Sequence, residues 1–413
     1  MEKAWGHSFV IEEYPAPGSL LENSPEEVKI TFNSGVESDF SIQVSGEAQK
    51  KVAVESASRS DDQKTISVQL PSLESGHYTV KYYVISSNDG HPVQGSFSFK
   101  VETDDPPLME DEKQNGEVPI PVIEKDDTGD AMPPEEQSLS INTAQLSEWF
   151  IYMMRAVYYA GLLLIIGWVF WWRVVQRYNG DILKKYALWG ISFQLLHLVG
   201  LLSLLLTQLM VFNENGLTFG ADFPFDTTFG AIWLFSLFLS LIGLVFLFKN
   251  QWFDYSWLIA LIVSKSMNGH SFEFEPVSIL VAANSIHLLA AGIWAAGLTF
   301  IVVFWRKQGM YVRQFMPLFS KVALLTMIVL SITGIFTTVM FLPSIDALFS
   351  DWGYFLLLKV GLVIIVLVVA AIIQAKYKND KAAEVEKLVK TDFFLMLLLV
   401  VIVSILTYVS PLS

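Results

Sequence analysis

The sequence contains no cysteine in 413 residues, which excludes disulfide bonds and thiolate metal sites. It is also poor in charge: only 16% of the residues are Asp, Glu, Lys or Arg, whereas 53% are hydrophobic. This balance is too apolar for one soluble domain of ordinary composition. The net charge of −14 excludes a nucleic-acid partner, because binding a row of phosphates requires clustered Lys and Arg. Any soft-metal chemistry must use histidine and methionine.

The scarce charges are unevenly distributed along the chain. Residues 1–146 contain 27 acidic and 10 basic side chains, whereas residues 147–413 contain 14 acidic and 17 basic ones. An acidic, soluble-looking part therefore precedes an apolar, slightly basic part. The sequence predicts two domains of different character.

Long apolar stretches recur through residues 147–413, and each is suited to crossing about 30 Å of hydrocarbon. The fourth stretch is the weakest, because it is short and carries Asp254 and Lys265. We expect an all-α membrane domain of eight transmembrane helices. The stretches cover residues 147–171, 186–211, 229–248, 253–269, 276–304, 317–341, 353–374 and 391–409.

The basic residues of this half predict its orientation. Fourteen of the 17 follow the first, third, fifth or seventh stretch, and the alternate connections carry mostly acids. By the positive-inside rule the basic side is cytoplasmic. We therefore expect a multi-pass plasma-membrane protein whose N-terminal domain and C-terminus are extracytoplasmic. The fourteen are Arg173, Arg177, Lys184, Lys185, Lys249, Arg306, Lys307, Arg313, Lys321, Lys376, Lys378, Lys381, Lys387 and Lys390.

Residues 7–102 show the period-two pattern of β-strands, as in the segments 28–32, 65–70, 78–84 and 96–101. Turn signals such as Asn88-Asp89-Gly90 separate the segments. About seven short strands in this length predict a β-sandwich or a Greek-key barrel. Residues 103–146 form the expected linker, because residues 102–137 contain 13 acids, two bases and six prolines.

Two candidate metal ligands lie in one predicted turn of this β domain. Asp89 and His91 are two residues apart, and a carboxylate with an imidazole suits a divalent copper or zinc ion. The alternative is an ordinary polar hairpin turn. A third ligand arises at His7 if residues 1–6 are the remnant of a cleaved signal peptide, because Ala4-Trp5-Gly6 fits a cleavage site. Both the α-amine and the imidazole of His7 are then free to chelate one ion.

Two segments carry a resemblance to the CopC family of periplasmic copper carriers. They read HSFVIEEYPAPGSLLENSPEEVKITFN and SGHYTVKYYVISSNDGHPVQGSFSFKV, and together they span about residues 7–102. The resemblance implies a cupredoxin-like, immunoglobulin-like sandwich that binds Cu(II) through His7, Asp89 and His91. Members that also hold Cu(I) use a Met-rich loop, and residues 8–102 contain no Met. We therefore expect no second copper site in this domain.

The apolar half resembles CopD, the inner-membrane partner of CopC. The matching pieces include Asn268-Gly269-His270, SIHLLAAGIWAAGL at residues 285–298, the segment from Phe319 to Gly334, and Tyr354 to Val360. CopC joined to CopD in one chain resembles the YcnJ-type copper-uptake proteins of Gram-positive bacteria.

Histidine and methionine side chains in the apolar half suggest a route for copper, because Cu(I) prefers imidazole and thioether ligands. Polar ionisable groups within a bilayer are also functional candidates by default. The alternatives are that Met fills the bundle core and that a buried His bonds a neighbouring helix. Gly292 and Ala296, four residues apart, predict close helix packing. The candidate ligands are His197, His270, His287, Met210, Met267 and Met340.

These observations predict a copper importer of the plasma membrane rather than an enzyme. The external domain would capture Cu(II), and the membrane domain would pass copper inward, as Cu(I) if the ion is first reduced. The sequence has no GxxxxGK[ST] motif that would indicate ATP-driven pumping. Two alternatives stay open: a copper-dependent oxidative enzyme, and a buffering or sensing protein without transport. Expected partners are copper, the lipid bilayer and an extracytoplasmic copper chaperone or reductase; the oligomeric state is open.

Overall fold

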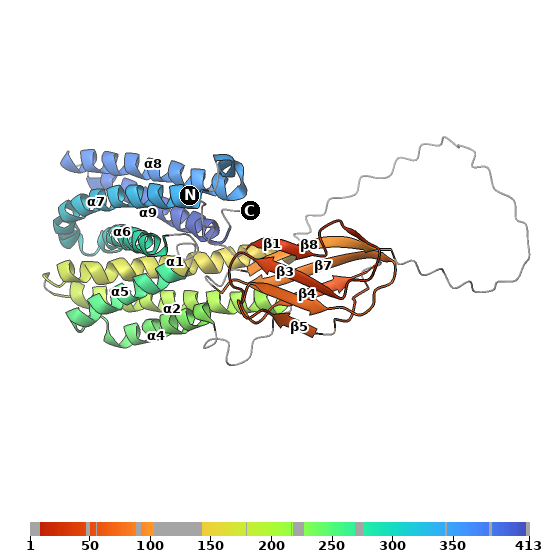
Figure 1. The fold of residues 1–413 in the computed structure, drawn as a ribbon. Helices are drawn as coiled ribbons and strands as arrows, with labels where there is room; N and C mark the ends of the chain where they lie inside the picture. Colours follow the sequence, from red (N-terminus) through yellow and green to blue (C-terminus); the bar gives the residue numbers. More distant parts are fainter. Residues whose placement is uncertain are drawn as a thin grey trace, which may run out of the picture.

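The structure is a computed structural model that contains a β domain followed by a helical domain (Figure 1). His7, Asp89, His91 and His270 lie outside the residues that it describes. The described residues are 9–46, 50–54, 56–87, 92–102, 143–178, 180–215, 217, 227–268, 276–342, 345–379 and 382–409.

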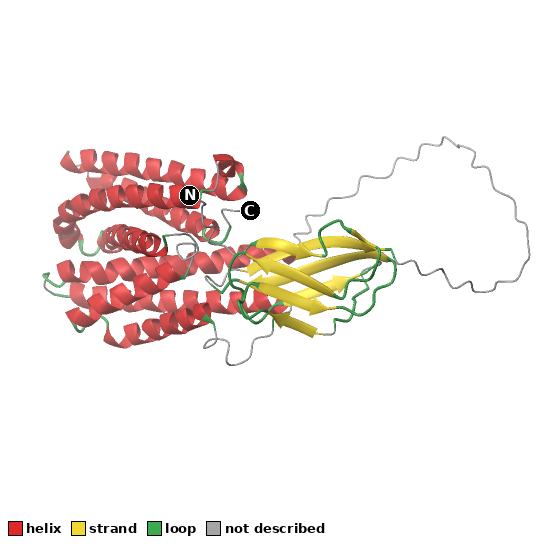
Figure 2. Cartoon of the chain, in the orientation of Figure 1, coloured by secondary structure: helices red, strands yellow, loops and turns green. Residues whose placement is uncertain are grey.

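Two four-stranded sheets form the β domain, which confirms the predicted all-β fold (Figure 2). The strand order is β1–β3–β6–β5 in one sheet and β2–β8–β7–β4 in the other. The eight strands are β1 (Val10–Tyr14), β2 (Leu20–Leu21), β3 (Glu27–Phe32), β4 (Ser41–Ser45), β5 (Ser56–Arg59), β6 (Thr65–Gln69), β7 (Gly76–Ile85) and β8 (Pro92–Val101).

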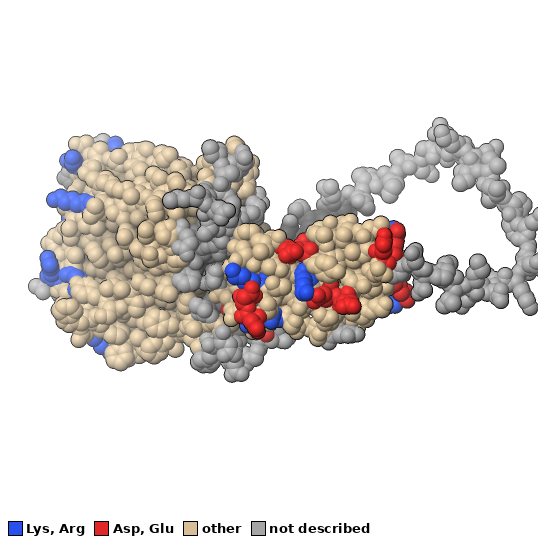
Figure 3. All heavy atoms as spheres, viewed as in Figure 1, with Lys and Arg blue, Asp and Glu red and all other residues tan. Residues whose placement is uncertain are grey.

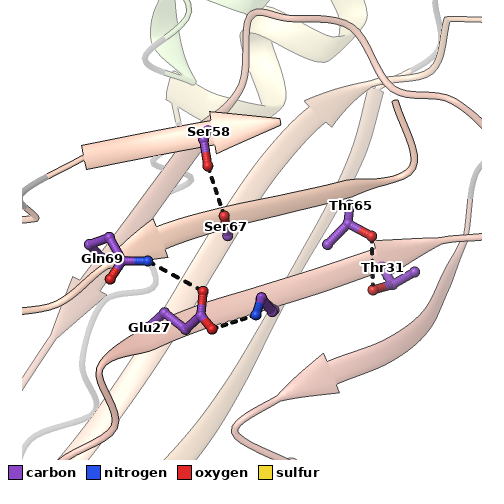
Figure 4. A network of polar contacts seen from close by, with 7 residues as sticks. Glu27, Thr31, Ser58, Thr65, Ser67 and Gln69 are labelled. Carbon is purple, nitrogen blue, oxygen red and sulfur yellow. Dashed lines mark hydrogen bonds and ion pairs between the residues drawn. The ribbon is translucent and has the colours of Figure 1, made fainter. Parts of the chain in front are cut away.

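Along the strands, side chains alternate between the buried and the outer face, so the two sheets can pack face to face as a sandwich. In β3, Val28, Ile30 and Phe32 are fully buried and pack in one core with Val80 and Phe99 of the other sheet. The intervening side chains point outward, as the period of two requires. On that outer face, polar pairs join neighbouring strands (Figure 4); the pairs are Thr31 with Thr65, Ser58 with Ser67, and Gln69 with Glu27.

Eight helices are present in the described part of the helical domain. Six are long and apolar enough to cross a membrane, and the remaining two, α4 and α5, have 19 and 17 residues. A multi-pass membrane domain is therefore confirmed, whereas eight crossings stay a prediction. The helices are α1 (Thr143–Val175), α2 (Ile182–Glu214), α4 (Thr228–Phe246), α5 (Gln251–Met267), α6 (Val277–Phe304), α7 (Gly309–Phe341), α8 (Asp351–Lys378) and α9 (Ala382–Leu406); a short 3-10 helix, η3, covers Ile345–Phe349.

Helix α1 lies at the centre of the bundle and packs against α2, α6 and α9. A Cβ atom on Gly167 would collide with the carbonyl oxygen of Gly292 and with Ala296. This contact confirms the close packing predicted from the two small residues of α6. Trp171 is buried at the same crossing, and its indole N–H donates to the carbonyl of Ile293 over 2.8 Å.

The two ends of the bundle differ in charge. The end formed by residues 176–178, 180–181, 247–250, 305–308 and 379, here called the basic end, collects most of the Lys and Arg that are visible on the helical domain (Figure 3). The β domain lies at the opposite end (Figures 1 and 3). Near the basic end, Arg173 and the buried Asp254 form an ion pair of 2.6 Å. The structure therefore separates the basic connections from the β domain by the length of the helices.

Candidate functional site

The strands β7 and β8 form a hairpin on either side of the predicted turn that contains Asp89 and His91. Its register runs from Gly76 opposite Val101 to Ile85 opposite Pro92. The described residues on either side of the predicted turn, Ser87 and Pro92, lie at the Ile85 end of this hairpin. Asp89 and His91 themselves lie outside the described residues.

One short turn, Asn33–Gly35, binds the flanks of both segments that carry the predicted ligands of the β domain. The backbone N–H of Phe9 donates to Oδ1 of Asn33 over 2.6 Å, and the N–H of Asn33 donates to the carbonyl of Phe9 over 3.0 Å. The backbone N–H of Ser87 donates to the carbonyl of Gly35, also over 3.0 Å. Phe9 is two residues after His7, and Ser87 is two residues before Asp89. The described flanks of the two segments, Phe9 and Ser87, are therefore anchored at neighbouring positions of one turn.

A buried carboxyl group lies beside this turn. Glu37 is 7% exposed, and its backbone N–H donates to the carbonyl of Ile85 over 2.8 Å. Burial raises the pKa of Glu37, an effect that nearby Arg59 opposes. Arg59 is itself held by a bond of 2.6 Å from its guanidinium to the carbonyl of Val36. This end of the β domain therefore has a fixed framework around a carboxyl group.

In the membrane domain, His287 lies between α6 and α7. Its Nδ1 atom is 2.8 Å from the hydroxyl of Thr333, and that hydroxyl donates to the carbonyl of Val329 over 2.7 Å. Because the hydroxyl hydrogen is used there, we assign the proton of the imidazole to Nδ1, which leaves a lone pair on Nε2. This tautomer is competent to bind a soft metal ion.

His197 of α2 occupies a different space in the bundle, facing α1 and α4. It is fully buried, its Nδ1 is 3.2 Å from the hydroxyl of Ser240, and its ring lies 5.6 Å from that of Tyr158. Gln194 donates to the carbonyl of the same Ser240 over 2.6 Å. Within the described residues, Nε2 of His197 and Oε1 of Gln194 have no hydrogen-bond partner.

The three candidate methionines lie near the C-terminal ends of helices, at the end of the bundle that faces the β domain. Met210 is in the last turns of α2 and is 60% exposed. Met267 ends α5, and Met340 is in the last turn of α7; both are partly buried. Among the residues that the structure describes, no group of three or more His, Cys, Asp or Glu is placed to hold a metal ion. The metal-ligand predictions stay predictions.

Sequence reasoning missed the partners of the two membrane histidines. The sequence did offer one signal for these partners, because each is a polar residue within an apolar stretch. They are Thr333, Ser240 and Gln194. Their pairing with a particular histidine depends on which helices are neighbours. Thr333 lies in the segment from Phe319 to Gly334 that resembles CopD, and it meets His287 of the segment 285–298 that carries the same resemblance.

Comparisons with known proteins agree with this architecture. Residues 10–102 match the family model of the CopC domain, and residues 313–406 match that of copper resistance protein D. The chain is 22% identical over 432 residues to the copper transport protein CutJ of Bacillus subtilis (strain 168), with 98% of this chain and 74% of that protein covered. It is 34% identical over 101 residues to protein YobA of Escherichia coli (strain K12), with 24% of this chain and 81% of YobA covered.

Among solved structures, CopC from Methylosinus trichosporium OB3b is similar, with 31% identity, a TM-score of 0.23, and 24% of this chain and 98% of that chain covered. The fold defines a multi-pass membrane protein with an N-terminal all-β domain. The chain therefore carries a CopC domain and a copper resistance protein D domain in one polypeptide, and its near-full-length relative CutJ is named as a copper transport protein.

Proposed function

We propose that this protein imports copper across the plasma membrane. The β domain binds Cu(II) outside the cell through the α-amine and imidazole of His7, with Asp89 and His91. The supporting observation is the Asn33–Gly35 turn, which ties the chain near His7 and the chain near Asp89 to one point. Amine, imidazole and carboxylate ligands suit Cu(II). This site requires that residues 1–6 are removed, because only then is the amine of His7 free.

The membrane domain crosses the bilayer eight times and passes copper inward. The concentration of Lys and Arg at the basic end supports a cytoplasmic location for that end. The β domain, at the other end, and the C-terminus are then extracytoplasmic. His287 supports a metal route best, because its assigned tautomer leaves Nε2 free; His197, His270, Met210, Met267 and Met340 are its other proposed members.

The test combines identification of the mature N-terminus with measurements of copper binding and copper uptake. Mass spectrometry of the purified protein establishes whether His7 is the first residue. Cu(II) titration then compares the wild type with His7→Ala, and His77→Ala serves as the control because His77 is exposed on β7. We expect His7→Ala to lower both Cu(II) affinity and cellular copper uptake. Unchanged cellular copper after deletion of the gene would favour buffering or sensing and would contradict import.

A further inference from the structure

An apolar cluster joins the β domain to the helical domain. It consists of Tyr83 and Ile85 from β7, Phe212 from α2, Leu217 from the segment after α2, and Trp233 from α4. Ile85 and Phe212 are fully buried, and Tyr83 and Leu217 are 5% and 3% exposed. We call this set the docking cluster. In Figures 1 and 2 the strands overlap the ends of α1 and α2, and the cluster contacts join β7 to α2 and α4.

The pattern of β7 explains why this contact is not part of the β-sandwich core. Tyr78, Val80 and Val84 face that core, so the alternate residues face outward. Along the outward face, His77 and Lys81 are exposed, whereas Tyr83 and Ile85 are buried. The outward face therefore changes from polar to apolar at the end of the strand that meets the helices. Without the helical domain, Tyr83 and Ile85 would be exposed to solvent on this face.

The helical side of the docking cluster is held by the cap of α2. The backbone N–H of Leu217 donates to the carbonyl of Phe212 over 3.0 Å, which is the long bond of a Schellman cap. This cap places the side chains of Leu217 and Phe212 together. The amide of Asn215 donates to the carbonyl of Val211 over 2.8 Å and further secures the helix end. The receiving surface is therefore fixed by local hydrogen bonds.

The docked strand end also carries the proposed copper loop. Ile85 pairs with Pro92 across the hairpin, so the described flank of the proposed copper loop lies at the strand end where Ile85 meets Phe212. Ser87, anchored to Gly35, is two residues after Ile85. The contact thus brings Ser87 and Pro92, which flank the proposed copper loop, toward the end of α2, whose last turns contain both Met210 and Phe212.

We propose that the docking cluster holds the copper-binding end of the β domain on the helical domain, so that copper passes between the two domains of one chain by ligand exchange without release into solution. This inference rests on the proposed import function. Tyr83 and Ile85 are positioning residues, because they fix the loop but do not bind the ion. The ion keeps its oxidation state in this step, so no electron donor is required.

The first experiment tests docking independently of copper. The chain has no cysteine, so a pair introduced as Ile85→Cys and Leu217→Cys is unique. A protease site is inserted within residues 103–142, and membranes are treated with a short bifunctional thiol reagent before cleavage. We expect the two fragments to stay linked on a denaturing gel. The control pair, Ile11→Cys with Leu217→Cys, uses the 58% exposed Ile11 and should separate. Separation of the Ile85 pair, or equal linkage of both pairs, would overturn docking.

The second experiment tests the role in transfer. Ile85→Asp places a charge in the docking cluster, and Ile11→Asp places the same charge on an exposed position of β1. We expect Ile85→Asp to reduce the rate of copper uptake at least tenfold while Cu(II) affinity of the purified full chain stays within twofold of wild type. Leu217→Asp should give the same result from the helical side, which guards against misfolding of the β domain. Ile11→Asp should transport normally.

The outcomes separate the two proposals. Normal uptake by Ile85→Asp and Leu217→Asp would overturn transfer through the docked interface even if import is correct. Uptake by the wild type that equals uptake by cells without the gene would overturn the import function, and the cross-linking result would then still report on docking.

Discussion

His287 on α6 and Thr333 on α7 are joined by a contact of 2.8 Å between Nδ1 and the threonine hydroxyl. The same hydroxyl is bound to its own helix at Val329, so the threonine fixes both the orientation and the tautomer of the imidazole. A metal ligand is often held in this way by a second group that does not touch the metal. His287 and Thr333, which lie on two consecutive helices, thus form a polar contact inside an apolar bundle.

Replacing Thr333 should therefore impair uptake more than an equivalent change nearby. Thr333→Val leaves Nδ1 of His287 without a partner, which costs about 1–3 kcal/mol and frees the ring to rotate. Thr337→Val is the control, because its hydroxyl bonds only the carbonyls of Thr333 and Gly334 on the same helix. We expect a several-fold lower uptake rate and a lower melting temperature for Thr333→Val. Equal uptake by the two variants would contradict a positioning role.

Removing the Asn33 side chain should weaken Cu(II) binding without unfolding the β domain. Asn33→Ala deletes the acceptor for the N–H of Phe9 and loosens the chain that leads to His7. A lost hydrogen bond of about 1–1.5 kcal/mol corresponds to roughly a tenfold lower affinity. Titration followed by absorbance measures this, with Asn23→Ala at an exposed position as the control. An Asn33→Ala affinity equal to that of the control would show that the turn does not organise the site.

Breaking the ion pair near the basic end should strongly destabilise the membrane domain. Arg173→Met leaves the carboxylate of Asp254, whose side chain is 1% exposed, without its cation. Loss of one partner from a buried pair costs about 3–5 kcal/mol. Lys390→Met removes one of the two exposed partners of Glu386, the other being Arg306, and should cost at most about 1 kcal/mol. Thermal unfolding in detergent compares the two, and the double variant Arg173→Met with Asp254→Leu should recover part of the loss.

Glu37 should make the stability of the β domain depend on pH. Burial raises its pKa in the folded state above 4.5, so the folded protein binds this proton more tightly than the unfolded chain does. Stability should then fall as pH rises through 4.5 toward the folded-state pKa, and stay lower above it. Glu37→Gln should remove this dependence and be more stable than the wild type at neutral pH. Melting curves recorded between about pH 4 and about pH 8 test whether stability falls as the pH rises.

Single cysteines should reveal the orientation in the membrane. We expect a membrane-impermeant maleimide to label Ile11→Cys in intact cells, because β1 belongs to the proposed external domain. Gln308→Cys lies between α6 and α7 at the basic end and should react only after permeabilisation. The reverse labelling pattern would place the β domain in the cytoplasm and exclude capture of external copper.

The sequence by itself determined the two-domain organisation and the identity of each domain. Periodicity separated the two: the alternation around Val28, Ile30 and Phe32 requires a half-buried strand, whereas uninterrupted apolar stretches of helical length require a membrane helix. Close packing of α6 against a neighbouring helix was also predictable, because Gly292 and Ala296 recur at helical spacing, although only the structure identifies that neighbour as α1. These are local properties, set by residues within a few positions of one another.

The tertiary structure alone decided which distant residues meet. Nothing in the order of the chain pairs His287 with Thr333 or His197 with Ser240, because both contacts depend on which helices are neighbours in the bundle. Nor does sequence show that Tyr83 and Ile85 face Phe212 rather than solvent, since their alternation reads as an ordinary strand. Long-range packing of complementary apolar surfaces fixed these contacts, and with them the position of the β domain on the end of α2.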